Sequence, residues 1–235
     1  MGTRKMARQS DIELPVNGRI TRGYLAAPPE DGPRPGVVVI QEWWGLNDHI
    51  RDMTDRFAAE GFIALAPDLY YGHSATEPDD ARKLAMAMEY PDALQVIQAA
   101  IDCLAADERV WPGQIGLVGF CMGGGLAWHG AAKLERVGAA VSCYGGGPEL
   151  TLEEAANIRA PILAIYGELD KGVSPEVAHR RAELMNAAGA PHETIIYPGA
   201  QHAFMNDRRP AYHPEATEAA WQRIVAHFRE ALRGA

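Results

Sequence analysis

Cysteine, aspartate and histidine side chains occur at three points of this chain where an apolar run gives way to a loop. Cys121 lies in GFCMG, Asp170 closes GELD, and His202 lies in PGAQHAF. A thiol can attack a carbonyl carbon once a base takes its proton, and a carboxylate can orient that base. A free thiol has a pKa of about 8.5, so thiolate chemistry near pH 7 needs such help. The three residue types therefore point to nucleophilic acyl transfer.

The residues around Cys121 favour a nucleophile. Gly119 and Gly123 flank it in G-x-C-x-G, the thiol counterpart of the G-x-S-x-G elbow at which a strand turns sharply into a helix. Glycines let neighbouring segments approach closely, and the N–H groups that begin the following helix favour a thiolate and a developing oxyanion. The alternative is a buried structural cysteine beside a glycine-rich packing contact. No G-x-S-x-G occurs that would compete with Cys121.

Asp170 and His202 are weak evidence when each is taken alone. A carboxylate past a strand is often a helix or turn cap, and a single histidine is usually structural. His192 begins a predicted strand, whereas His179 and His227 lie within predicted helices. His202 instead lies in a glycine-containing loop after a strand, downstream of Asp170. Its place in the chain, rather than its residue type, makes His202 the candidate base.

A fourth feature is the segment QEWWG at residues 41–45, which ends a predicted strand. The loop here is suited to supply one N–H group of an oxyanion hole, from the amide of Trp43, beside the amide of Met122. Glu42 would then point toward Cys121. The alternative for Glu42 is a solvated loop carboxylate with aromatic neighbours in the core.

The elements that must position these residues alternate along the chain. Strands are expected over residues 37–41, 62–68, 114–120, 138–146, 161–170 and 192–200. Helices are expected over residues 48–60 with Asp48 as N-cap, 78–107 with a break at Pro91, 122–135, 175–188 and 214–233. This alternation predicts an α/β fold with a mostly parallel central sheet and helices on both faces. Such sheets bind ligands at the carboxyl ends of their strands.

The length of 235 residues is enough for one large α/β domain. We expect residues 1–10 to be a loose segment and residues 11–235 to form a single α/β domain. The net charge of −9 leaves no electrostatic footprint for a nucleic acid and disfavours docking on an anionic membrane. No apolar run approaches the ~18 residues of a spanning helix, so a cytoplasmic protein is expected. The oligomeric state stays open.

The three cysteines, Cys103, Cys121 and Cys143, do not suggest a disulfide framework, because their number is odd and their spacing wide. The sequence also contains no C-x-x-C pair and no H-E-x-x-H helix. We therefore expect free thiols, no metal site and no cofactor.

Six motifs together, QEWWGLN, APDLY, GFCMGGG, YGGG, GELD and GAQHAF, resemble the dienelactone hydrolases, also called carboxymethylenebutenolidases, of the α/β-hydrolase fold. The resemblance spans about residues 11–233, and the order nucleophile, acid, base is also that of α/β hydrolases. It implies Cys121 as nucleophile, His202 as base and Asp170 as orienting acid. It further implies that Glu42 contacts the resting thiol and moves when substrate arrives.

The resemblance departs from the family at the substrate-binding arginines. Family members hold a substrate carboxylate with arginines, one of them four residues after the catalytic histidine, where this chain has Asn206. Arg208 and Arg209 follow closely and are candidates to replace it, and Arg82 is a further candidate. For all three arginines, plain surface charge is the alternative.

The expected reaction is hydrolysis of a lactone or small ester through a cysteinyl acyl-enzyme. A general carboxylesterase or thioesterase on the same triad is one alternative. A protein that binds a small metabolite without catalysis is another, although a binding module has no need of Cys121, Asp170, His202 and Glu42 together.

Overall fold

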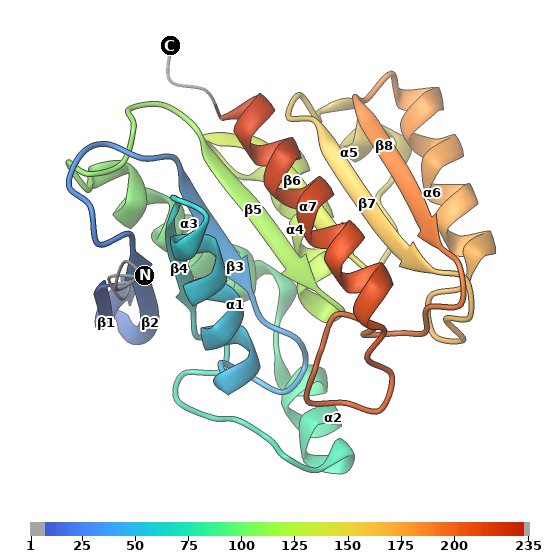
Figure 1. Cartoon of the computed structure of the whole chain (residues 1–235), viewed down its shortest axis with the longest axis horizontal. Coiled ribbons are helices and arrows are strands. Elements are labelled where there is room, and N and C mark those ends of the chain that lie inside the picture. The colour runs from blue at the N-terminus through green and yellow to red at the C-terminus, as the bar shows by residue number, and fades with distance from the viewer. Residues whose placement is uncertain (1–7, 233–235) are drawn as a thin grey trace, which may run out of the picture.

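The computed structural model describes residues 8–232. Its strands are β1 (Arg8–Val16), β2 (Arg19–Ala27), β3 (Gly36–Ile40), β4 (Ile63–Pro67), β5 (Ile115–Phe120), β6 (Val137–Cys143), β7 (Ile162–Gly167) and β8 (His192–Tyr197). They form one sheet in the order β1-β2-β4-β3-β5-β6-β7-β8 (Figure 1). The strands from β4 to β8 are parallel, and the β1–β2 hairpin adds to β4 antiparallel. The expected mostly parallel sheet is confirmed.

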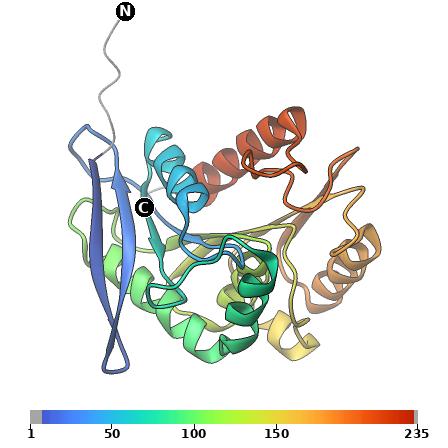
Figure 2. The ribbon, with the colours of Figure 1, turned by 90° about the horizontal axis from the view of Figure 1, so that it is seen from below.

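Helices cover both faces of this sheet, as expected. They are α1 (Asp48–Ala59), α2 (Pro78–Ala87), α3 (Tyr90–Ala106), α4 (Met122–Lys133), α5 (Leu152–Ala156), α6 (Pro175–Ala188) and α7 (Pro214–Ala231). Seen along the sheet, α1 and α7 lie on one side, and α3, α4 and α6 lie on the other (Figure 2). Two apolar clusters, one on each side, join these helices to the strands. None of the helices in residues 8–232 is long and apolar enough to cross a bilayer.

The central strands are buried on both faces. Every residue of β3, β4, β5 and β7 is buried, which explains why they appear in the sequence as continuous apolar runs instead of alternating patterns. The edge strand β8 has no fully buried position. The fully buried strands therefore lie inside the sheet, and Cys121 directly follows one of them, β5.

The pairing register brings the functional loops together. Ile40 pairs with Gly119, Phe120 pairs with Cys143, and Gly167 pairs with Tyr197. The strands β3, β5, β6, β7 and β8 therefore finish at one edge of the sheet, which is where ligands bind in parallel α/β sheets.

Several element ends differ from those expected. Asn47, not Asp48, caps α1, because its extended backbone lets its side chain accept from the amide of Ile50 at 3.2 Å. The strand β6 ends at Cys143 rather than at residue 146, because Tyr144 turns the chain with a φ of 39°.

Two further differences concern the N-terminal segment and the long helical region. The break in that region falls at residues 88–89, and Pro91 lies in the first turn of α3, where a proline is tolerated. Residues 8–10, expected to be loose, belong to β1. The remainder of the expected loose segment, residues 1–7, lies outside the described residues.

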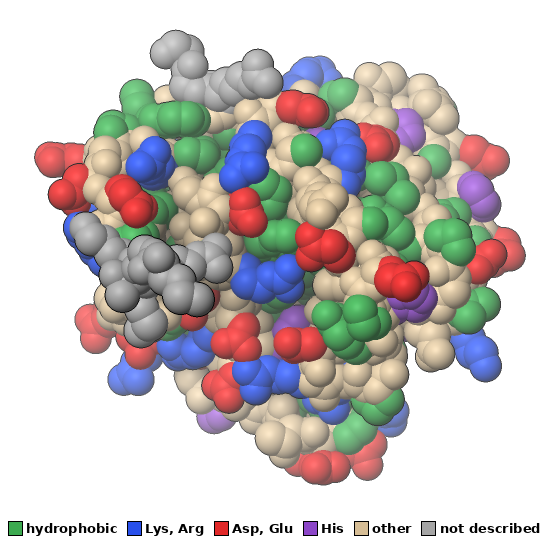
Figure 3. All heavy atoms as spheres, in the orientation of Figure 1, with side chains coloured by type: hydrophobic (Ala, Val, Ile, Leu, Met, Phe, Trp, Pro, Cys, Tyr) green, Lys and Arg blue, Asp and Glu red, His purple; other side chains and the backbone are tan. Residues whose placement is uncertain are grey.

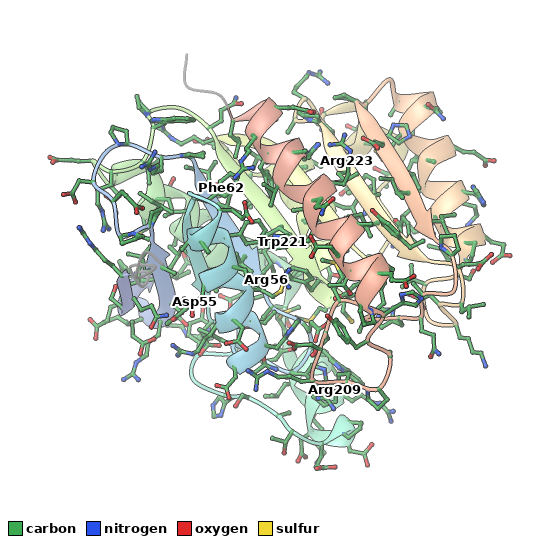
Figure 4. The ribbon with its side chains drawn as sticks, in the orientation of Figure 1. Asp55, Arg56, Phe62, Arg209, Trp221 and Arg223 are labelled. Carbon is green, nitrogen blue, oxygen red and sulfur yellow. The ribbon has the colours of Figure 1, made fainter. Side chains whose placement is uncertain are left out.

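The face formed by α1 and α7 mixes charges of both signs (Figure 3). Ion pairs join these elements to their surroundings, such as Arg208 to Asp52 and Arg229 to Glu60. Beneath the charges, Phe57 of α1 packs against Trp221 of α7, with ring centroids 4.7 Å apart. The guanidinium of Arg56 lies over the Trp221 ring, 4.2 Å from its centroid, and both residues are labelled in Figure 4. Aromatic packing therefore joins α1 to α7.

We predict that Phe57→Ala lowers the free energy of unfolding by about 3–5 kcal/mol, because a fully buried aromatic side chain is replaced by a cavity. Urea unfolding followed by circular dichroism measures the change. Ile20→Ala, at a side chain that is 62% exposed, is the control and should shift stability by no more than about 0.5 kcal/mol. Equal effects of the two substitutions would contradict this account of the core.

Candidate active site

Cys121 lies at a sharp elbow between β5 and α4. Its φ is 54° and its ψ is −115°, a backbone conformation that is strained for a residue with a side chain. The elbow closes only because its flanking residues are glycines. A Cβ on Gly119 would lie 1.9 Å from the carbonyl oxygen of Gly123, and a Cβ on Gly123 would lie 2.5 Å from the carbonyl oxygens of Ile40 and Gln41. The predicted strand–elbow–helix context of Cys121 is thus present.

The side chains of Cys121, His202 and Asp170 form a continuous chain. His202 Nε2 is 3.2 Å from Cys121 Sγ, and His202 Nδ1 is 2.7 Å from Asp170 Oδ2. The other carboxylate oxygen of Asp170 accepts from the amides of Gly172 and Val173, both at 2.8 Å. Asp170 is buried, whereas His202 is partly open to solvent. The fixed carboxylate therefore holds an imidazole that faces the thiol.

The imidazole of His202 favours its protonated form. Burial alone would lower its pKa, but the hydrogen bonds and charges of Asp170 and Cys121 outweigh burial and raise the pKa of His202 to about 10. The ring therefore keeps a second proton near neutral pH, and its Nε2 lies against the Cys121 sulfur.

The amides of Trp43 and Met122 lie on the two segments that meet at the elbow. The close approach of Gly123 to Ile40 and Gln41 packs the start of α4 against the end of β3. Within residues 8–232, neither amide donates a hydrogen bond to a protein acceptor. Unpaired N–H groups on converging segments are the usual components of an oxyanion hole.

Glu42 is buried, and its carboxylate faces the loop that carries His202. Asn206 Nδ2 donates to Glu42 Oε2 at 2.9 Å, and both side chains are at most 2% exposed. Burial raises the pKa of the Glu42 carboxyl, although the hydrogen bond from Asn206 acts in the opposite direction. The family resemblance implied a resting contact between Glu42 and Cys121. Among the described residues, however, the sulfur hydrogen-bonds to His202, and no hydrogen bond joins it to Glu42.

Tyr144 and Asn206 belong to this site, although the sequence assigned neither a role. Tyr144 directly follows β6, and its ring packs edge-on against His202 with centroids 5.3 Å apart. Its position at the end of a central strand was the available signal, because Cys121 follows β5 in the same way. Asn206 stood out only as the residue replacing an expected arginine.

The three candidate arginines lie in different surroundings. Arg82 on α2 is 64% exposed and faces Asp79 at 3.8 Å, and Arg208 pairs with Asp52 and Asp48 of α1. Arg209 lies in the loop that precedes α7 (Figure 4). Its guanidinium is 3.8 Å from the centre of the Trp44 ring, and its charge acts on the Glu42 carboxyl. Of these three arginines, only Arg209 therefore interacts with the segment at residues 41–45.

The other two cysteines are not suited to nucleophilic chemistry. Burial raises the pKa of both Cys103 and Cys143, which keeps them as thiols. All three cysteines are free of disulfides. Within residues 8–232, no group of three or more His, Cys, Asp or Glu side chains is arranged to hold a metal ion.

Comparison with known proteins places the chain in a family. Residues 21–232 match the model of the "Dienelactone hydrolase family". "Protein usf" of Aquifex pyrophilus is 38% identical, and the "Putative carboxymethylenebutenolidase" of Aquifex aeolicus is 36% identical; each alignment covers 94% of this chain and 98% of the relative.

Solved structures agree with the sequence relatives. The crystal structure of a "Putative Dienelactone Hydrolase" from Klebsiella pneumoniae superposes with a TM-score of 0.88 at 31% identity, covering 96% of this chain and 100% of that one. An acylaminoacyl peptidase of Pyrococcus horikoshii, 15% identical, shares the fold with a TM-score of 0.74, over 98% of this chain and 43% of that one. The chain thus belongs to the dienelactone hydrolase family and is a carboxylic ester hydrolase of the α/β-hydrolase fold.

Proposed function

We propose that the protein hydrolyses a lactone or small ester through a covalent intermediate on Cys121. The observation that carries this proposal is the continuous chain from Cys121 through His202 to Asp170, with distances of 3.2 and 2.7 Å at the carboxyl edge of the sheet. His202 accepts the thiol proton, and Asp170 orients the ring and stabilises its positive charge.

Acylation begins when the Cys121 sulfur attacks the carbonyl carbon of the substrate. The carbonyl oxygen takes up negative charge, which the amides of Trp43 and Met122 stabilise. The tetrahedral intermediate collapses by breaking the ester C–O bond, and the imidazolium of His202 gives its proton to the leaving oxygen. For a lactone, that oxygen stays attached to the acyl group as a new hydroxyl.

Deacylation uses the same imidazole with a lower proton affinity. Cys121 contributes to the raised pKa of His202 through its hydrogen bond and its charge. A thioester at Cys121 carries no such charge, so the pKa of His202 falls and the ring can take a proton from water. The resulting hydroxide attacks the thioester carbon, the C–S bond breaks, and the proton returns to the Cys121–His202 pair.

Arg209 is the best-placed of the three arginines to receive a carboxylate on the substrate. Stacking on Trp44 holds its guanidinium beside the segment that carries the Trp43 amide. A planar guanidinium binds a carboxylate with two parallel hydrogen bonds. Arg208 and Arg82 already face aspartates. We therefore extend the proposal to lactones that carry a carboxylate, such as dienelactone.

The proposed reaction is tested by hydrolysis of cis- and trans-dienelactone and of p-nitrophenyl acetate. Cys121→Ala should lower kcat by at least about 10³-fold on every substrate that the wild type cleaves, because it removes the attacking atom. Steady-state rates, with circular dichroism to confirm folding, measure this. Cleavage of the acetate alone would identify a general esterase, and wild-type rates in Cys121→Ala would overturn the proposed nucleophile.

A second prediction concerns the dependence of kcat/KM on pH. The raised pKa of about 10 keeps His202 protonated up to alkaline pH, so its proton for the leaving group is lost only as pH rises through that value. Asp170→Asn removes a hydrogen bond and a charge that raise the pKa, so the alkaline limb should move to lower pH. Profiles of wild type and variant measure the shift, and coincident alkaline limbs would contradict the role of Asp170.

The third prediction separates Arg209 from its neighbour. Arg209→Ala should raise KM for dienelactone about 10- to 100-fold, because hydrogen bonds to the charged carboxylate of the substrate are lost. The KM for p-nitrophenyl acetate, which has no carboxylate, should change little. Arg208→Ala, the matched control, should leave both KM values within about 3-fold of the wild type. A larger effect of Arg208→Ala on dienelactone would assign the carboxylate to Arg208 instead.

A further inference from the structure

Asn206 connects two segments of the site that are far apart in the sequence. Its Nδ2 donates to Glu42 Oε2 at 2.9 Å, and its Oδ1 accepts from the amide of Arg208 at 3.1 Å. Its own amide donates to the carbonyl of Ala203, the residue after His202, at 2.9 Å. Both partners of the link to Glu42 are fully buried. The turn that follows His202 is therefore tied directly to the segment after β3.

The peptide bond between Glu42 and Trp43 lies at the other end of this link. Its N–H group is the Trp43 amide, one of the two proposed oxyanion donors. Its carbonyl, on Glu42, accepts from the amide of Gly45 at 3.3 Å, and the next carbonyl, on Trp43, accepts from the Tyr70 hydroxyl at 3.2 Å. Among residues 8–232, the side chain of Glu42 thus supplies the one hydrogen-bonded connection from this peptide to the loop of His202.

We propose that Asn206 and Glu42 form a positioning pair, in which their hydrogen bond fixes the Trp43 amide relative to His202; this role rests on the proposed function. In this role Glu42 acts by holding the peptide in place and exchanges no proton with Cys121. The sulfur already has its proton acceptor in His202, 3.2 Å away. Asn206 fits the role because an amide donates to a carboxyl group and accepts from a backbone amide at the same time.

The buried setting of Glu42 supports holding over proton exchange. Its Oε1 has no hydrogen bond of regular geometry among the described residues, and the nearby Tyr144 hydroxyl likewise has none. Burial raises the pKa of the Tyr144 hydroxyl, and the neighbouring Glu42 carboxyl raises it further. The hydrogen bond from Asn206 holds Oε2 of this carboxyl group, whereas the Cys121 sulfur hydrogen-bonds to His202.

The test exchanges the two functional groups of the pair. In Glu42→Gln, the amide oxygen still accepts from Asn206, so kcat should fall by less than about 5-fold, whereas Glu42→Ala removes the link and should lower kcat about 10- to 100-fold. Asn206→Asp places two carboxyl groups face to face and should cause a similar loss. The double variant Glu42→Gln with Asn206→Asp restores donor and acceptor in reversed order and should recover kcat to within about 5-fold of the wild type.

Activity on p-nitrophenyl acetate and the midpoint of urea unfolding should be measured together. The losses should appear in kcat and kcat/KM alike, because oxyanion stabilisation acts in the transition state. The urea midpoint should fall in Asn206→Asp and recover in the double variant. Asn186→Asp, at an exposed asparagine of α6, is the matched control and should change neither quantity.

The outcomes distinguish the pair from the proposed reaction. A Glu42→Gln variant as inactive as Glu42→Ala, or a double variant that recovers stability without activity, would overturn the positioning role and assign proton transfer to Glu42. A double variant that recovers neither would overturn the hydrogen-bonded pair. Wild-type turnover in Cys121→Ala would reject the nucleophile instead, and the urea midpoints would still decide whether the pair exists.

Discussion

The site depends on one steric constraint, the close packing of the start of α4 against the end of β3. A Cβ on Gly123 would meet two carbonyl oxygens at 2.5 Å, so this approach exists only because the residue is glycine. It permits the positive φ of Cys121 and places this residue directly after a fully buried strand. It also sets the Met122 amide beside the segment of Trp43. One contact thus locates both the proposed nucleophile and the two proposed oxyanion donors.

The parallel register supplies the remaining groups. Because the strands β3, β5, β6, β7 and β8 finish at one edge, the residues that follow them lie close together despite large separations in sequence. His202 comes within 3.2 Å of Cys121 across 81 positions, and Asn206 reaches Glu42 across 164. The buried strands thus form a rigid scaffold that positions the loops, and these loops carry the candidate catalytic residues.

The sequence predicts the parts of this arrangement that depend on local pattern. Buried central strands are continuous apolar runs, and the glycine elbow, the candidate acid and the candidate base all follow such runs, so the α/β fold and the three-residue set could be predicted. The short helix α5 was not expected, because its five residues carry little periodicity. A capping box of Thr151 and Glu154 was its one local signal.

Features that depend on tertiary partners could not be predicted in the same way. The hydrogen bond of Asn206 to Glu42 is visible only when the two loops are placed together. Tyr144 contacts His202 because β6 ends earlier than its apolar pattern suggests. Arg208 and Arg209 are neighbours of identical type, and only their surroundings, aspartates of α1 for one and Trp44 for the other, separate them.

The most direct measurement for the central claim is to trap the covalent intermediate. The wild-type protein is mixed with p-nitrophenyl acetate, quenched in acid within milliseconds, digested and analysed by mass spectrometry. We expect an acetyl group on the peptide that contains Cys121, together with a burst of p-nitrophenol that does not exceed one equivalent of enzyme. An acetyl group on a different side chain, formed at the rate of turnover, would contradict it.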